Sequence, residues 1–358
     1  MVLDVVRHAE ARIAGANEME YLPIGGLQSA VDGALRLAYG RDAAVLAQGR
    51  VAALQTLSGT GACRMFAEAV ARYMPGSIAY VPRPTWSNHH NIFRDAGVPV
   101  REYAYYDPAT RGLDLDGMLS DLARAPEGSV VLLHACAHNP TGVDPSQKDW
   151  AQISALMRAR NLFPMFDMAY QGFASGDFDA DAAAVRRFVD DGHSLALAQS
   201  FAKNLGLYGQ RVGVLSVVTG CDFETAALNS QLRAIARPMY SSPPLHGALL
   251  LATVLGDEGL RTEWAAEVRA MAHRIRDMRG LLRGHLEGTC GSGLPWGHIT
   301  DQIGMFCYTG MTPQHVAALT AQHSVYLTRN GRISMAGVTP DNVERLARAI
   351  HAVTTQQH

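Results

Sequence analysis

The chain has 358 residues, of which 48% are hydrophobic and 18% are charged, and this length is enough for a large core and two domains at roughly 150 residues per domain. Its formal net charge of −2 at pH 7 gives no electrostatic case for nucleic acid or an anionic membrane surface as a partner. No apolar run approaches the roughly 20 residues that span a bilayer, which excludes a predicted membrane-spanning helix.

The first two thirds of the chain alternate between amphipathic helical stretches and apolar, β-branched runs. Residues 1–15 have apolar side chains at helical spacing and carry Asp4 and Glu10, which predicts an amphipathic helix and not a signal or transit peptide. Further helices are predicted over 62–74 and 146–161, and strands over 77–83, 130–136, 162–170, 195–201 and 211–218. Apolar strands interleaved with helices indicate an α/β fold with a mainly parallel central sheet covered by helices.

The pattern changes near residue 265. A long helix predicted over 262–286 leads to shorter mixed elements and to a closing helix over 341–353. We therefore predict a large domain over residues 1–265 and a smaller C-terminal α+β domain over residues 266–358.

The cysteines indicate the compartment. Cys63, Cys136, Cys221, Cys290 and Cys307 are odd in number, scattered and free of any CxxC pair. This usage is typical of reduced thiols in a cytosol-like compartment, so we expect a cytoplasmic protein, with a mitochondrial location as the alternative.

Lysine is rare in this chain. Among 31 basic residues only Lys148 and Lys203 are lysines, and Lys203 lies in a turn of small residues directly after a predicted strand. Arginine stays charged in proteins, whereas a desolvated lysine can lose its proton and become a nucleophile. The scarcity of lysine therefore favours a chemical role for Lys203 over an ordinary solvated side chain.

Several polar residues come just after stretches with strand character. Ligands of open α/β sheets bind beyond the carboxyl ends of the strands, so these residues are expected to converge on one site. They are Gly59, Thr60, Gly61, Trp86, Asn139, Asp167, Tyr170, Ser200 and Lys203.

Taken singly, these features leave alternatives open. The glycine-rich turn at 58–64 opens a helix and suits an anion, but it matches neither GxGxxG nor a Walker A motif and is equally a plain loop. His134 and His138 have helical zinc spacing, yet they follow a strand and run into Asn-Pro, so a turn is favoured and no metal site is predicted. Asp167 needs a partner, either a helix N-terminus or a protonated ring nitrogen. Arg211 is either a phosphate clamp or a surface charge.

Seven segments together resemble the class I aspartate/aromatic aminotransferase group of fold-type I pyridoxal-phosphate enzymes, in order and with similar spacing from Val2 to the C-terminus. The segments are SGTGACR, PTWSNHHNIF, HNPTGVDP, FDMAYQGFASG, SFAKNLGLYGQRVG, YSSPPLHGA and GRISMAG. The resemblance implies the fold of that group and pyridoxal 5′-phosphate as the cofactor.

The resemblance also implies how each residue contacts the cofactor. Lys203 would form the Schiff base and carry the proton, while Asp167, supported by His89, would keep the pyridine nitrogen protonated. Tyr170 and Asn139 would hydrogen-bond the 3′ oxygen. The other implied cofactor contacts are Ser58, Gly59, Thr60, Trp86, Ser200 and Arg211, with Tyr21 from a partner subunit.

For the substrate, the resemblance implies that Arg332 clamps the α-carboxylate and that Arg237 reaches across a homodimer to a side-chain carboxylate, with Trp86 and Asn139 as further contacts. The expected activity moves an amino group between L-aspartate and 2-oxoglutarate or oxaloacetate, with aromatic amino acids or methionine as further substrates. The alternatives are an aromatic or broad-specificity aminotransferase, lyase or decarboxylase chemistry on the same cofactor, a nicotinamide-dependent dehydrogenase, and a catalytically impaired cofactor-binding protein.

The sequence departs from the group at two places. Ala202 stands where many members have a serine that touches the phosphate, and the loss of that hydroxyl would cost about 1 kcal/mol of cofactor binding. Members also carry further residues ahead of the match to VLDVVR, so an N-terminal arm and the N-terminal part of the small domain are expected to be missing here. We expect a chain that truly starts at Met1 to bind the cofactor but to transaminate poorly.

Overall fold

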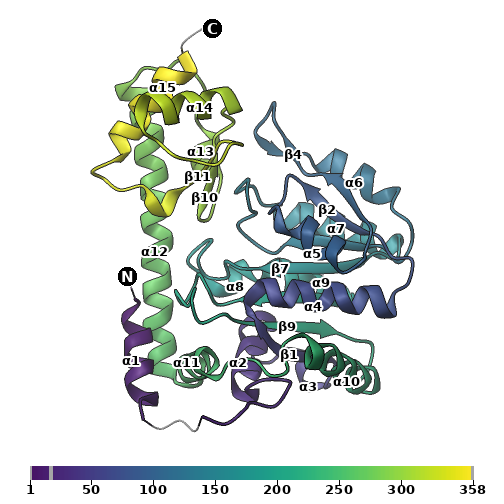
Figure 1. Ribbon diagram of the computed structural model, residues 1–358. Coiled ribbons are helices and arrows are strands. Elements are labelled where there is room, and N and C mark those ends of the chain that lie inside the picture. The colour runs from purple at the N-terminus through teal and green to yellow at the C-terminus, as the bar shows by residue number, and fades with distance from the viewer. Residues whose placement is uncertain (1, 16–18, 356–358) are drawn as a thin grey trace.

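The computed structural model describes residues 2–15 and 19–355. A seven-stranded sheet in the order β1-β9-β8-β7-β6-β2-β3 forms its centre (Figure 1). Strands β3, β2, β6, β7 and β8 run parallel, whereas β9 is antiparallel to both β8 and β1. The strands are β1 (Val51–Leu57), β2 (Ala79–Arg83), β3 (Val100–Ala104), β6 (Val130–His134), β7 (Phe163–Met168), β8 (Leu195–Ser200) and β9 (Val212–Val218).

Helices cover both faces of this sheet, as strands with near-continuous apolar sequences require. Side chains alternate between two cores: Val131 and Leu133 face one core, while Val130 and Leu132 face the other. The first core is covered by α1 (Asp4–Ile13), α2 (Gln28–Tyr39), α6 (Leu115–Ala123), α7 (Gln147–Ala159), α9 (Ala183–Asp190) and α11 (Leu245–Gly256); the second is covered by α4 (Ser58–Tyr73), α5 (Asn88–Asp95) and α10 (Asp222–Met239). The predicted α/β class and mainly parallel sheet are confirmed.

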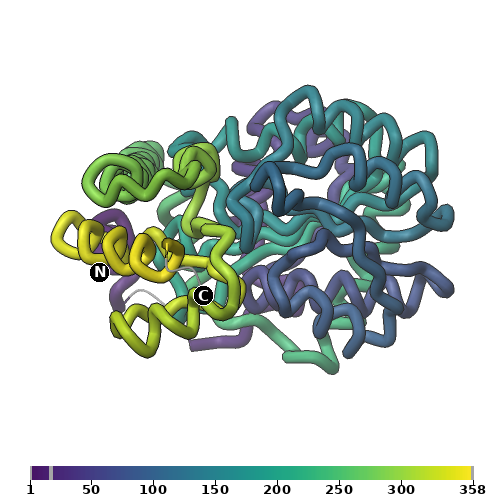
Figure 2. The backbone as a smooth tube through the Cα atoms, turned by 90° about the horizontal axis from the view of Figure 1, so that it is seen from above, coloured from purple at the N-terminus to yellow at the C-terminus, as the bar shows by residue number. Residues whose placement is uncertain are grey.

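A smaller unit is built at the far end of the long helix α12 (Glu258–Gly284), which passes from α1 and α11 to the C-terminal elements (Figure 1). In Figure 2 this C-terminal part, light green to yellow, lies to one side of the sheet. Its remaining elements are the π-helix His285–Thr289, α13 (His298–Asp301), β10 (Phe306–Tyr308), α14 (Pro313–His323), β11 (Arg332–Ser334), a 3-10 turn (Met335–Gly337) and α15 (Val343–Thr355).

The side chains of α12 change core partway along the helix. Trp264 and Val268 pack into the core beside the sheet, whereas Ile275, Met278 and Leu282 pack into the core of the smaller unit. The change of core falls between Val268 and Ile275, inside a continuous helix, and the division into residues 1–265 and 266–358 stays a prediction.

Most predicted elements are present with shifted ends. Helix α4 begins at Ser58, so the glycine-rich turn is its first turn, and the long helix begins at Glu258. The expectation that Asp167 follows its strand is wrong: Asp167 lies inside β7, and Ser200 is the last residue of β8. The edge strands β1 and β3 lie outside the predicted set, as does the hairpin of β4 (Tyr106–Asp107) and β5 (Gly112–Leu113). The helices outside it include α2, α5, α6, α9, α10 and α11 and the short α3 (Ala44–Ala47) and α8 (Phe178–Asp181).

Strand direction brings the candidate residues to one edge of the sheet. The parallel strands β6, β7 and β8 end there, and β1 ends there too because both β1 and β8 are antiparallel to β9. For the same reason β9 begins at this edge, which places Arg211 beside the end of β8, where Ser200 is paired with Gly213. None of the helices in the described part of the chain is long and apolar enough to cross a membrane.

Gly213 is required by close packing at this edge. A Cβ atom there would lie 2.5 Å from the Gln199 carbonyl oxygen and 2.6 Å from the Ser58 carbonyl carbon. Gly213→Ala is expected to destabilise the protein by about 1–3 kcal/mol because backbone cannot move aside as a flexible side chain can. Urea unfolding measures this, with Gly209→Ala as control, since a Cβ at Gly209 meets nothing within 4 Å. Equal stability of the two variants would contradict the packing argument.

Candidate active site

A pocket of about 230 Å³ opens at this edge of the sheet, against the smaller unit. Apart from Gly61 and His89, the sequence predicted thirteen residues for the site. Eleven of them line this pocket, and Tyr21 and Arg237 do not. The pocket is lined by Ser58, Gly59, Thr60, Trp86, His134, Cys136, Asn139, Asp167, Ala169, Tyr170, Ser200, Lys203, Arg211, Phe306 and Arg332.

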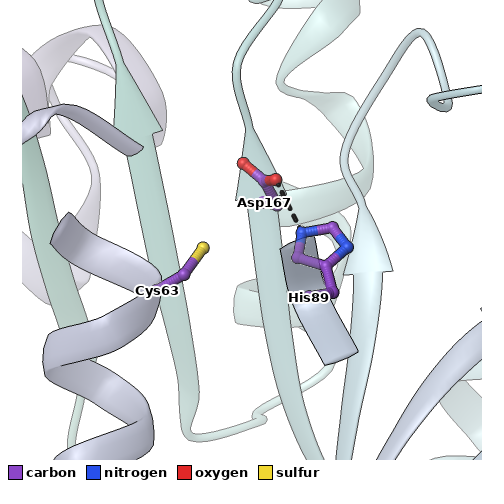
Figure 3. Close-up of side chains that lie close together, drawn as sticks. All are labelled: Cys63, His89 and Asp167. Atoms are coloured by element: carbon purple, nitrogen blue, oxygen red, sulfur yellow. Dashed lines mark hydrogen bonds and ion pairs between the residues drawn. The ribbon is translucent and has the colours of Figure 1, made fainter. Parts of the chain in front are cut away.

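Asp167 is anchored by a histidine behind it. His89 is fully buried, and its Nε2 lies 3.1 Å from Asp167 Oδ2 (Figure 3). Burial alone would raise the pKa of Asp167, but the hydrogen bond from His89 together with the electrostatic effects of His89, His134 and Lys203 outweighs it, so the pKa lies below its usual value. Oδ1 makes no hydrogen bond to another described residue, so an ionised carboxylate oxygen is available to a donor in the pocket.

The proton on His89 is placed by a chain of hydrogen bonds. The Asn139 backbone N–H donates to His134 Nδ1 at 3.3 Å, so that nitrogen must be an acceptor. Burial lowers the pKa of His134 to about 3, and the neutral ring therefore donates from Nε2 to Thr85 Oγ1 at 3.0 Å. The Thr85 hydroxyl is then left to donate to His89 Nδ1 at 2.8 Å, which leaves the His89 proton on Nε2, facing Asp167.

Cys63 lies across from this pair on α4 (Figure 3). One ligand atom each from Cys63, His89 and Asp167 falls within 4.8 Å of the others, which is a grouping that can attract a metal. Two of the three are already bound to each other, however, and burial raises the pKa of the thiol well above its usual value. These contacts favour an organic donor at Asp167 over a metal ion.

Lys203 stands in the turn after β8, half-buried, with its Nζ 5.8 Å from the centre of the Tyr170 ring. Burial lowers the pKa of Lys203, the nearby Asp167 opposes this effect, and Arg211 adds to it. A lysine with a lowered pKa in a polar pocket is more readily the neutral amine that attacks a carbonyl group. The structure thus gives Lys203 the environment that its scarcity suggested.

An anion cradle lies on the α4 side of the pocket. The hydroxyls of Ser58 and Ser200 are 2.9 Å apart at the first turn of α4, where backbone N–H groups are unpaired, and Thr60 and Arg211 complete the lining. Arg211 uses one nitrogen to donate to the Tyr208 carbonyl at 3.0 Å, which leaves the rest of its guanidinium for a ligand. Ala202 is buried, and its backbone N–H donates to Ser200 Oγ at 3.3 Å.

A second cation lies on the opposite side, from the smaller unit. Arg332 begins β11 and donates from Nη1 to Asn139 Oδ1 at 2.8 Å. The Phe306 ring covers its guanidinium, with a distance of 4.1 Å to the ring centre, and Tyr170 packs edge-on against Phe306 at 6.4 Å. An arginine whose fork is partly held in place is suited to a carboxylate.

The turn that carries Asn139 is fixed from below by Asp144. Its carboxylate accepts from the backbone N–H groups of Ala137 at 2.6 Å and His138 at 2.9 Å. The His138 ring stacks on Tyr105 at 4.0 Å and His138 Nδ1 bonds Thr141, so His134 and His138 both serve the turn, as favoured over zinc binding.

Tyr21 and Arg237 were predicted for the site but do not line the pocket. Tyr21 is 86% exposed, and Arg237 is exposed near the end of α10, where it donates to Ser241 Oγ at 2.5 Å.

Sequence reasoning missed Thr85, Phe306, Cys136 and Ala169, and it treated His134 as part of a turn only. Cys136 and Ala169 follow β6 and β7 directly, so the rule used for the other residues could have found them. Phe306 had no such signal, because it comes from a three-residue strand of the smaller unit. Thr85 is recognised only once two buried imidazoles are seen to share it.

The donor set fits one kind of ligand: a flat ring with a protonated nitrogen at Asp167, an anionic group in the Ser58–Arg211 cradle, and a carbonyl carbon at Lys203. Trp86 lines the same pocket with its ring edge-to-face against His89 at 5.1 Å, and it offers an aromatic surface to such a ring.

Comparison with known proteins agrees with this geometry. The chain is 57% identical over 354 residues to the mitochondrial aspartate aminotransferase of Arabidopsis thaliana, a match that covers 99% of this chain and 82% of the relative. Two solved structures are similar over 99% of the chain. One is a mitochondrial aspartate aminotransferase from Trypanosoma brucei (TM-score 0.96, 44% identity, 92% of that chain). The other is an aromatic-amino-acid aminotransferase from Burkholderia pseudomallei covalently bound to pyridoxal phosphate (TM-score 0.96, 40% identity, 88% of that chain). Residues 1–350 match the family described as aminotransferase class I and II, and the chain belongs to that family.

Proposed function

We propose that this protein is a pyridoxal-phosphate-dependent aminotransferase that moves an amino group between L-aspartate and 2-oxoglutarate or oxaloacetate. The observation that carries the proposal is the arrangement in one pocket of a lysine with a lowered pKa, an ionised carboxylate with a free oxygen, and an arginine fork. The relatives named above, aspartate and aromatic aminotransferases, have the same overall fold.

Residues of opposite charge are proposed to contact opposite ends of the cofactor. Asp167 Oδ1 would accept a hydrogen bond from the protonated ring nitrogen, while the Ser58 and Ser200 hydroxyls, the first turn of α4 and Arg211 would hold the phosphate. Lys203 would hold the cofactor covalently, and its free amine would move the proton at the substrate α-carbon. The bound cofactor supplies the electron sink that this proton transfer needs.

Tyr170 and Asn139 are proposed to hold the 3′ oxygen of the ring. Burial raises the pKa of the Tyr170 hydroxyl, so this group stays a neutral donor. Asn139 has its Oδ1 engaged by Arg332, which leaves its amide nitrogen as a donor toward the pocket. Asn139 is therefore proposed to link the cofactor to Arg332, which binds the substrate.

Arg332 is proposed to bind the α-carboxylate of both the amino acid and the oxo acid. Because it is half-buried and its second face is covered by Phe306, an incoming carboxylate replaces little water and meets a fork already oriented. Aspartate is the favoured substrate because of the relatives' identities, and aromatic or broad specificity is the alternative, favoured by the resemblance to an aromatic-amino-acid aminotransferase.

The partner is proposed to be a second copy of the chain. Tyr21 and Arg237 are exposed, charged or polar, and distant from the pocket of their own chain, as expected of side chains that complete the neighbour's site. The five cysteines are free, which suits a reducing compartment; a cytoplasmic location is proposed, with the mitochondrion as the alternative that the Arabidopsis relative suggests.

A visible absorption titration tests the function first. The purified protein with added pyridoxal phosphate is expected to turn yellow, and L-aspartate is expected to bleach that colour at lower concentration than L-tyrosine or L-methionine. Bleaching by tyrosine first would favour the aromatic alternative. Colour that no amino acid bleaches would indicate the impaired cofactor-binding protein, and no colour at all would contradict the proposal.

Arg332→Lys is expected to raise the KM for L-aspartate and for 2-oxoglutarate by about 10- to 100-fold, because one ammonium replaces two parallel hydrogen bonds to a carboxylate. Steady-state kinetics with each substrate varied in turn measures this. Arg329→Lys, an exposed arginine three residues away, is the matched control and should leave both KM values unchanged. An unchanged KM in Arg332→Lys would remove this arginine from the substrate site.

Subunit complementation tests the shared dimer site. Lys203→Ala and Arg237→Ala chains are each expected to be nearly inactive toward L-aspartate, whereas a hybrid dimer rebuilds one site from the intact Lys203 of one chain and the intact Arg237 of the other. Random mixing should restore about a quarter of wild-type activity. If mixing restores nothing although hybrids form, Arg237 does not act across an interface.

A further inference from the structure

Arg279 is a buried cation without an acidic partner. It lies on α12 with 2% of its surface exposed, and in the described part of the chain no carboxylate forms an ion pair with it. Its guanidinium donates instead to three backbone carbonyls: Nη1 to Ile299 at 2.9 Å, and Nη2 to Gly304 at 2.9 Å and to Phe306. Burying an unpaired charge costs free energy, so Arg279 is expected to have a role that offsets this cost. Its three hydrogen bonds indicate that this role is to hold the backbone from Ile299 to Phe306 in place.

The segment from Ile299 to Phe306 runs from α13 into β10, and its residues 302–305 belong to neither a helix nor a strand. On one side Arg279 bonds three of its carbonyls, and on the other the segment packs against the turn that carries Asn139. The backbone N–H of Ile303 donates to the Gly142 carbonyl at 2.8 Å. A Cβ atom at Gly304 would lie 2.4 Å from the Ala137 Cβ, so the two backbones touch there, and Gly304 has the positive φ of 83° that glycine tolerates.

Both neighbours of Arg332 depend on this segment. Phe306, whose ring covers the Arg332 guanidinium, ends the stretch that Arg279 holds. Asn139, which accepts from Arg332, lies in the turn against which Ile303 and Gly304 pack. Arg279 itself does not line the pocket, so any effect on the substrate must pass through these contacts.

We propose that Arg279 is a positioning residue for substrate carboxylate binding: it fixes the 299–306 segment so that Phe306 and Asn139 hold the Arg332 fork in place. The proposal rests on the function proposed above. It assigns to helix α12 an indirect role in substrate affinity that is separate from cofactor binding, since the hydrogen bonds of Arg279 do not reach the Ser58–Arg211 cradle.

The test compares Arg279→Lys and Arg279→Met as holoenzymes. Both variants should keep the affinity for pyridoxal phosphate within about twofold, and calorimetric binding of succinate, a dicarboxylate that cannot react, should weaken by about tenfold or more. The KM for L-aspartate should rise with a smaller change in kcat, and Arg279→Lys should retain part of the wild-type affinity because it keeps the charge and one donor. Arg276→Met, about one turn earlier on α12, is the control: Arg276 is exposed and donates to the Ser175 carbonyl, outside the 299–306 segment, so succinate affinity should stay unchanged.

A purely structural role would give a different pattern. Lower thermal stability with unchanged succinate affinity, or a parallel loss of cofactor and succinate affinity, would overturn the proposal. Phe306→Leu keeps the three carbonyls and tests the route even if the Arg279 variants fold poorly: it should reproduce the weaker succinate binding, and normal binding in this variant would also overturn the proposal. If the wild-type protein fails the absorption titration, the proposed function fails; if it passes and the variants bind succinate normally, only this inference fails.

Discussion

The buried carboxylate of Asp167 places the strictest demand on this structure. It lies inside a strand that is otherwise apolar, where burial favours the neutral acid, and it remains ionised because His89 donates a hydrogen bond to it. In the neutral His89 ring the proton is kept on Nε2 because Thr85 donates to Nδ1. Thr85 can do so because the neutral His134 ring, oriented by the Asn139 backbone, donates to it in turn. The ionised Asp167 therefore depends on three parts of the fold at once: the turn after β6, the first turn of α5 and the strand β7 in the middle of the sheet.

The antiparallel strand β9 solves a second problem of placement. In an all-parallel sheet every strand would end at the edge where the pocket lies, so only residues that follow strands could line the pocket. Because β9 runs the other way, its start, with Arg211, meets the end of β8, with Ser200, across a single pair of residues. Arg211, which lowers the pKa of Lys203 and completes the anion cradle, thus lies at the start of β9. The loops after the parallel strands are left for the other residues of the site.

The sequence predicted the residues whose role is local and missed those whose role depends on tertiary contacts. Lys203, Asp167 and Asn139 follow or end apolar runs and could be singled out by position alone, and the seven ordered segments predicted the fold and cofactor class. The strand β3 is short, and its exposed residues Arg101 and Glu102 are consecutive, so it lacks the alternation of exposed and buried side chains that predicts a strand. Thr85, Phe306 and Arg279 carry no local signal, because a threonine between two rings, an aromatic ring over a guanidinium and an arginine among carbonyls are defined only by what the fold brings near them. Tyr21 and Arg237 were predicted from the resemblance, and the geometry of a single chain leaves them on its surface.

The helix α12 contributes side chains to two cores, with Trp264 and Val268 in one and Ile275, Met278 and Leu282 in the other. A helix propagates its hydrogen bonds from turn to turn, so melting of either half removes the template on which the other half is packed. The two units therefore share one cooperative element, and neither is a self-sufficient module that can be cut out at residue 265 with its core intact. Because the same helix also carries Arg279, the packing of both units and the backbone behind the carboxylate site depend on one continuous element.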